Sequence, residues 1–181
     1  MKAKQNLLVV TAVSLLMGAG SASAIDMEVG IHFADYDDFD SGFGAHGQLD
    51  VIESVRLSGS YTAVDNLDAL VGRAGWVLGM EEMGLEIELG AGYQFWDFEG
   101  PFEDDVYGLH GIASYQVMDE FSVQGKLEFL SFDNMDDETL VIGLGAAYDI
   151  TPEISVGMDV EIYEADFLDQ TFIRLGGSFR F

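Results

Sequence analysis

Residues 85–95 read LEIELGAGYQF, a stretch in which apolar side chains alternate with acidic, amide or glycine positions. Side chains alternate across an extended strand, so Leu85 and Ile87 share one face while Glu86 and Glu88 share the other. The same period of two recurs along the chain between acidic, Gly- or Pro-containing segments, and no 3.6-residue pattern is sustained. The sequence therefore predicts an all-β protein.

Ten stretches of this kind can be counted, each about ten residues long. Soluble strands cluster near roughly five or six residues, whereas a tilted strand needs about 9 to 11 residues to cross a bilayer. The lengths therefore favour membrane-spanning strands. We expect them at residues 25–34, 43–52, 55–64, 69–78, 84–95, 106–117, 122–132, 139–150, 154–163 and 171–181.

Charged residues occupy only one face of these strands. A soluble barrel or sandwich would also alternate, so the alternation alone leaves both classes of protein open. A lipid-facing surface excludes charge near its midplane, where Arg or Lys costs about 2 to 4 kcal/mol. The apolar register carries no charged residue, so we expect the charges to face a lumen. They include the bases Arg56, Arg73, Lys126, Arg174 and Arg180 and the acids Glu86, Glu88, Glu128, Asp159 and Glu161.

The strand ends and connections fit the same prediction. Connections alternate between acidic loops, at 35–42, 65–68, 97–105, 133–138 and 164–170, and shorter turns, at 53–54, 79–83, 118–121 and 151–153. Aromatic residues on the apolar register gather near strand ends, as in the two interfacial girdles of membrane barrels. They are Phe33, Phe43, Tyr61, Phe95 and Tyr107 toward the loops, and Trp76, Tyr115, Tyr148, Phe179 and Phe181 toward the turns.

Hydrocarbon offers no water to an unpaired backbone amide, so a sheet that spans a membrane must close on itself. An even number of strands lets the first and last strands pair antiparallel. We therefore predict a closed antiparallel transmembrane up-and-down β-barrel of about ten strands, with eight as the alternative. Ten strands place both termini at the turn end, as expected for periplasmic termini.

The N-terminus resembles a secretory signal. Lys2 and Lys4 precede an apolar run at 7–17, which is too short to span a bilayer, and the small-residue triplet 22–24 follows. We expect residues 1–24 to be a signal peptide and residues 25–181 to form one barrel domain. That domain has no Cys and a formal charge of −28, from five bases and 33 acids, which argues against nucleic-acid binding.

The last nine residues read IRLGGSFRF, with an apolar or small residue at every second position back from Phe181. This ending resembles the C-terminal signal of Gram-negative outer-membrane barrels, and the whole alternating pattern is similar to the group that includes the OmpA membrane domain, although that domain has eight strands. The resemblance implies an outer-membrane location, lipid and lipopolysaccharide around the barrel, and recognition of Phe179 and Phe181 by the barrel assembly machinery.

Two functions remain open at this point. Our first expectation is a structural or interaction barrel with acidic extracellular loops, which we expect to be a monomer. The alternative is a narrow cation-preferring pore, because inward glycines would leave room for water and the strand acids outnumber the bases. The excess acids are hydrated, protonated or matched by cations.

Enzyme and metal sites are weaker hypotheses. Some ten-stranded outer-membrane barrels are proteases with Asp and His at the rim. Asp35, Asp37 and His32 are the nearest equivalent here, but no catalytic motif is specific and we expect no enzyme. The loop carboxylates suit Ca²⁺ or Mg²⁺, and a pair of imidazoles suits a transition metal. The candidate ligands are His32, His46, Asp37, Asp38, Asp104 and Asp105.

Overall fold

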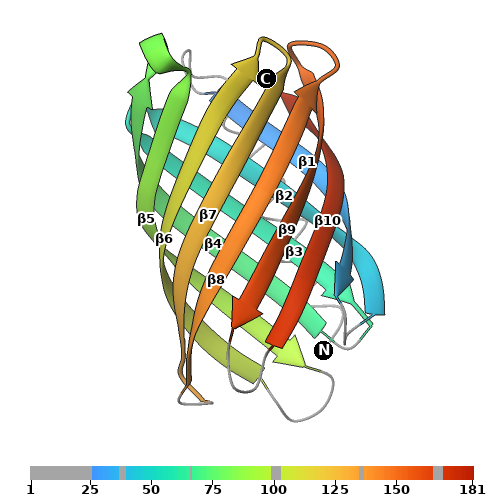
Figure 1. Ribbon diagram of the computed structural model, residues 1–181. Helices are drawn as coiled ribbons and strands as arrows, with labels where there is room; N and C mark the ends of the chain where they lie inside the picture. The colour runs from blue at the N-terminus through green and yellow to red at the C-terminus, as the bar shows by residue number, and fades with distance from the viewer. Residues whose placement is uncertain (1–25, 37–39, 66, 99–102, 135–136, 165–168) are drawn as a thin grey trace.

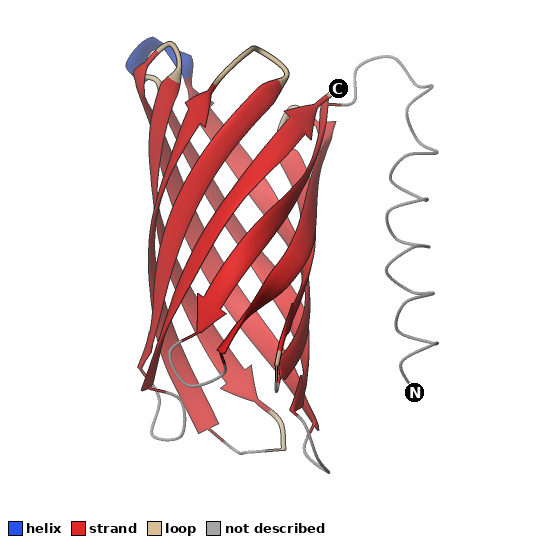
Figure 2. Cartoon of the chain, turned by 90° about the vertical axis from the view of Figure 1, so that its right-hand side faces the viewer, coloured by secondary structure: helices blue, strands red, loops and turns tan. Residues whose placement is uncertain are grey.

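The computed structural model describes residues 26–36, 40–65, 67–98, 103–134, 137–164 and 169–181. The predicted signal peptide, residues 1–24, lies outside the described residues. The described chain forms a single closed antiparallel barrel of ten strands (Figures 1 and 2), which confirms the predicted fold class and excludes the eight-stranded alternative. No helix of the described residues is long and apolar enough to cross a membrane.

Each strand pairs with its neighbours in the sequence, and the first and last strands pair with each other. The strands are β1 (Asp26–Tyr36), β2 (Asp40–Ile52), β3 (Val55–Val64), β4 (Leu67–Met80), β5 (Leu85–Phe98), β6 (Glu103–Met118), β7 (Phe121–Phe132), β8 (Asp137–Asp149), β9 (Ile154–Glu164) and β10 (Asp169–Arg180), with a short 3₁₀ helix η1 (Glu81–Met83) between β4 and β5.

The two ends of the barrel differ. Strands β1 and β10 meet in a ladder that includes Glu28 opposite Arg180, and the Phe181 N–H donates to the Met27 carbonyl at 2.9 Å. This seam places the end of the chain at the same end of the barrel as η1 and the short turns, at the top of Figures 1 and 2. We call this end the turn end and the opposite end the loop end. At the turn end the backbone is left-handed at Gly84, where φ is +60° and the N–H donates to the Glu81 carbonyl.

Several strands extend beyond their predicted bounds at the loop end. Strand β5 continues to Phe98 and β6 begins at Glu103, so most of the predicted acidic loop at 97–105 is strand. The sequence prediction stopped these strands where acidic residues begin, because Asp is rare in strands. Cross-strand hydrogen bonds continue past that point and extend the barrel wall.

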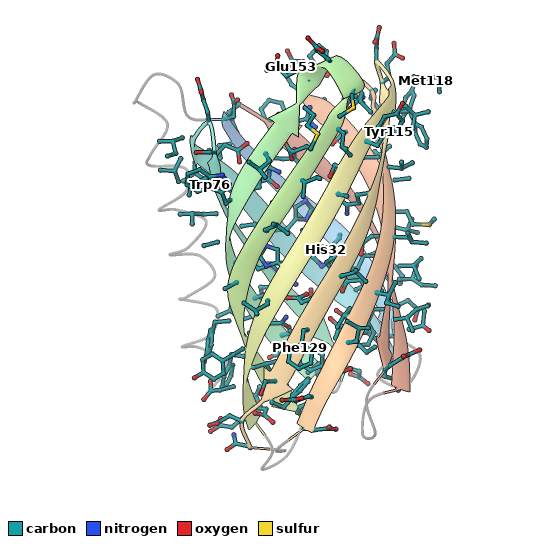
Figure 3. All side chains as sticks on the ribbon, turned by 60° about the vertical axis from the view of Figure 1, so that its left-hand side comes forward. His32, Trp76, Tyr115, Met118, Phe129 and Glu153 are labelled. Carbon is teal, nitrogen blue, oxygen red and sulfur yellow. The ribbon has the colours of Figure 1, made fainter. Side chains whose placement is uncertain are left out.

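The outer surface is an apolar belt. Side chains such as Ile31, Leu109, Leu127 and Leu144 are exposed on it, which in water would be an unusually large apolar patch. Exposed aromatics border the belt: Trp76 and Tyr115 lie toward the turn end and Phe129 toward the loop end (Figure 3). The belt has the composition and the aromatic borders of a lipid-facing surface.

Candidate functional site

The candidate site is the barrel lumen, which changes character from one end to the other. The inward side chains of β5 show this change. From the turn end toward the loop end they are Glu88, Gly90, Gly92, Gln94 and Trp96. Ion pairs therefore extend from the turn end to the middle of the lumen, with neutral polar side chains among them at the turn end, and aromatic side chains fill the loop end. Each zone is described in turn.

Aromatic and aliphatic side chains fill the lumen at the loop end. Trp96 packs against Phe132 and Tyr163 with ring centroids 5.7 and 5.8 Å apart, and Phe172 packs against Tyr163 at 4.4 Å and Tyr36 at 4.0 Å. The Trp96 Nε1–H donates to Gln94 Oε1 at 2.9 Å. We call this buried cluster the aromatic plug: Tyr36, Trp96, Phe132, Tyr163 and Phe172 with Ala34, Val64, Leu67, Ala69, Val106, Leu130 and Val141.

Sequence reasoning missed the aromatic plug. Its aromatic members lie on the inward register, and each is within two residues of a predicted strand end. The signal was available, since Trp96 continues the polar register of Glu88 and Gln94. The predicted strand ends at Phe95, where the acidic segment begins, so Trp96 falls outside it.

A layer of ion pairs lies next to the plug. Glu128 accepts hydrogen bonds from Arg73 at 2.8 and 3.1 Å and from Lys126 at 3.1 Å. Lys126 also pairs with Glu161, which in turn pairs with Arg174. We call this set the charge layer: Arg73, Lys126, Glu128, Asp159, Glu161 and Arg174.

Two further ion-pair groups lie toward the turn end. Arg56 donates to Asp50 and Glu86 at 2.7 and 2.5 Å and lies 3.5 Å from Glu88. Glu88 also meets His110 Nε2 at 2.9 Å. The remaining cation is at the barrel seam, paired with acids on two strands: Arg180 with Glu28 and Asp149.

The structure brings together all ten residues expected in a lumen charge network, although they form three groups rather than one. Each of the five bases contacts at least one carboxylate, and most are shared between two. An unpaired buried charge costs several kcal/mol. Because one base can pair with two carboxylates, the buried acids of these groups are all paired although the acids outnumber the bases.

Inward glycines make room for side chains rather than for an open channel. A Cβ at Gly75 would lie 2.5 Å from Glu88 Cγ, and one at Gly90 would lie 2.7 Å from His110 Cε1. The predicted role of these glycines, to leave space for water, is thus wrong at these positions. A cavity of about 20 Å³ lies between the plug and the charge layer, enough for roughly one water molecule.

The turn-end part of the lumen is different. Besides the two ion-pair groups, its inward side chains are small or neutral polar ones that are half-buried or exposed, so this end of the lumen is accessible to solvent. We call this part the vestibule, and it is lined by Gln48, Ser58, Ser114, Ser122 and Gln124.

The candidate metal ligands do not gather at one place. Asp104 points inward, is buried and accepts the Asn134 backbone N–H, whereas Asp105 is on the opposite face of β6 and accepts from the Tyr93 hydroxyl. Asp37 and Asp38 lie outside the described residues. No group of three or more His, Cys, Asp or Glu suited to a metal occurs among the residues that the structure describes.

The structure also shows where the paired histidines, Asp35 and the C-terminal phenylalanines lie. The imidazoles of His32 and His46 stack, with Nδ1 atoms 3.3 Å apart. His32 is buried inward midway along the barrel, whereas Asp35 is exposed on the other face of β1, so the two cannot act together on one substrate. Phe179 and Phe181 pack edge to face at 4.8 Å and are exposed at the turn end.

No protein-family profile and no curated protein sequence matches the chain. Solved structures do resemble it. The KdgM porin shares 12% identity over 85% of this chain and 99% of its own, with a TM-score of 0.52. The NanC porin shares 11% over 83% and 98%, with a TM-score of 0.54. An outer-membrane channel from Pseudomonas putida F1 shares 10% over 87% and 95%, with a TM-score of 0.50.

At these identities the likeness shows the fold, which is that of bacterial outer-membrane β-barrels. Combined with the exposed apolar belt and its aromatic borders, that fold places the protein in the outer membrane.

Proposed function

We propose that the protein is a closed outer-membrane barrel with a structural or interaction role, without enzymatic activity and without a conducting channel. The aromatic plug carries this proposal. A side-chain-filled lumen is common in small barrels, whereas water-filled channels belong to much wider ones. Trp96, Phe132 and Phe172 are each only 2% exposed, so the loop end leaves no evident path for a hydrated ion.

The charge layer supports the same function by a second route. Glu128 and Glu161 are buried and already paired with Arg73, Lys126 and Arg174. An ion crossing this layer would have to separate these pairs, and separating a buried pair costs about 3 to 5 kcal/mol.

Planar-bilayer recording of the folded wild-type protein tests the proposal. We expect a flat baseline under an applied voltage, with insertion confirmed by flotation of the same preparation with vesicles. Stepwise conductance from inserted protein would contradict the closed-barrel function.

A narrow cation-preferring pore is the second candidate. The wet vestibule and the surplus of acids over bases in the lumen favour it. If conductance steps appear, reversal potentials in a KCl gradient should show cation preference, and Glu86→Gln, which removes a carboxylate near the vestibule, should weaken that preference.

The interaction role that we propose is at the loop end, through divalent cations shared with lipopolysaccharide phosphates. Carboxylates are ligands that Ca²⁺ and Mg²⁺ prefer. Asp105 supports the proposal because it lies on the outer face of β6, beside the exposed aromatic residues Tyr93 and Tyr107. There it would meet the headgroup region rather than the lumen.

Thermal unfolding in two kinds of vesicle tests this interaction. Millimolar Ca²⁺ should raise the unfolding midpoint in vesicles that contain lipopolysaccharide and leave it unchanged in phosphatidylcholine vesicles. An equal rise in both would mean that the loops bind Ca²⁺ without lipopolysaccharide, and no rise in either would reject a cation bridge altogether.

A further inference from the structure

We propose that His32 and His46 form a binding site for a divalent transition metal, Cu²⁺ or Zn²⁺, inside the barrel. Their Nδ1 atoms lie 3.3 Å apart. Imidazole nitrogens bind Zn²⁺ at about 2.0–2.1 Å, so two such ligands on a tetrahedral ion are separated by about 3.3 Å. The two rings therefore have the separation that a shared metal ion requires. The proposal does not depend on whether the barrel conducts.

A hydrogen bond on the far side of His32 orients its ring. His32 Nε2 lies 2.9 Å from Thr62 Oγ1, and Thr62 also hydrogen bonds with Tyr36. In the tautomer with a proton on Nε2, His32 donates to Thr62 and Nδ1 keeps its lone pair. Histidine ligands of metals are usually held in this way, with the second ring nitrogen donating to a neighbouring group.

Two glycines make the space that the rings occupy. His32 lies opposite Gly44 in the β1–β2 ladder, and His46 lies opposite Gly30. A Cβ on Gly44 would be 2.2 Å from His32 Nε2, and a Cβ on Gly30 would be 2.5 Å from His46 Cε1. Any other residue at these positions would displace a ring, so the backbone of both strands accommodates the pair.

The surroundings admit a cation. The charged groups that act on the two rings are Glu28, Asp159 and Arg174, and Arg174 is itself paired with Asp159 and Glu161. His46 is only half-buried, so an ion can reach it by way of the vestibule. Among the described residues no third His, Cys, Asp or Glu completes the set, so water would fill the remaining positions.

Cu²⁺ is the best probe, because imidazole suits it and it binds most tightly of the first-row divalent ions. Folded protein purified from outer membranes would be titrated with Cu²⁺ and examined by electron paramagnetic resonance. We expect one saturable ion per barrel and hyperfine splitting from two nitrogens. A plain hydrogen bond between the rings would give the same distance without saturable binding, and that result would overturn the proposal.

Variants identify the ligands. His46→Asn should weaken Cu²⁺ binding at least tenfold, whereas His110→Asn, which changes a lumen histidine outside the pair, should leave it unchanged. Thr62→Val, which removes the orienting hydrogen bond but no ligand, should weaken binding about 10- to 100-fold. Each variant is first checked for folding by its heat-dependent gel shift.

The outcomes remain decisive if one variant does not fold. If His46→Asn fails the gel-shift test, the nitrogen splitting of the wild-type spectrum and the Thr62→Val titration still show whether the two histidines bind the copper ion. An oxygen-only spectrum, or equal weakening by His110→Asn, would assign the bound copper elsewhere and refute the site.

Discussion

Glu161 provides the sharpest test of the charge layer. Its carboxylate is buried and pairs with both Lys126 and Arg174, and its second oxygen accepts from the Tyr163 hydroxyl at 3.3 Å. Glu161→Gln keeps the shape of the side chain and removes the charge. It should destabilise the barrel, because the buried Lys126 and the half-buried Arg174 then each lose a carboxylate.

The expected loss of stability depends on which carboxylates Lys126 and Arg174 keep in the variant. Removing one partner of a buried ion pair costs about 3–5 kcal/mol. Here Lys126 keeps Glu128 at 3.1 Å and Arg174 keeps Asp159 at 2.7 Å. We therefore expect the lower end, about 3 kcal/mol, which is about two orders of magnitude in the unfolding equilibrium constant.

Urea unfolding of the protein in detergent or vesicles, followed by tryptophan fluorescence, measures the free energy of unfolding. Glu86→Gln is the matched control, since Glu86 is 36% exposed and its partner Arg56 keeps Asp50 and Glu88. That variant should cost less than about 1 kcal/mol, as partly exposed pairs do.

A double-mutant cycle then tests whether the layer acts as a unit. Combining Glu161→Gln with Lys126→Met removes one acid and one base together, so the double variant should lose less stability than the sum of the single ones, by about 0.5–3 kcal/mol. A loss under about 0.5 kcal/mol for Glu161→Gln, or one no larger than for Glu86→Gln, would refute the reasoning.

Three further predictions concern the wall of the barrel. Leu127→Arg, in the middle of the apolar belt, should cost about 2–4 kcal/mol in lipid unfolding experiments, and Ile154→Arg at the turn end about 0–1 kcal/mol; equal costs would argue against a lipid-facing belt. Gly42→Ala should cost about 1–3 kcal/mol in the same assay, because its Cβ would clash with a β3 carbonyl oxygen. Gly79→Ala should be nearly neutral, because no atom lies within 4 Å of the added Cβ. Phe181→Ala should lower the amount of folded protein in outer membranes, measured by gel shift, while spontaneous refolding in detergent stays unchanged; a normal cellular level would reject Phe181 as an assembly signal.

The fold was largely predictable because its signals are local. Residues two apart share a face of a strand, so the alternation in LEIELGAGYQF already separates the belt from the lumen. All ten strands were expected, and Ile87 and Glu88 face the sides predicted for them. The strand ends were less well predicted, because β5 and β6 continue through acidic residues that local propensity assigns to a loop.

The contents of the lumen were harder to predict. The charged residues were identified individually, but the aromatic plug and the division of the ions into three groups were not. Trp96 and Tyr163 come from strands β5 and β9 and meet only across the closed barrel. Nothing in either strand alone specifies that contact.

The sequence by itself therefore determined which residues form strands and which face of each strand carries charge, whereas the structure decided between ten strands and eight. These properties depend on a two-residue period and on the cost of charge in lipid. Only the tertiary structure decided which inward side chains meet, as when Arg73 reaches Glu128 across 55 residues and Arg180 reaches Glu28 across 152. Such contacts depend on closure of the barrel and on the register between strands, which bring distant residues to the same height in the lumen.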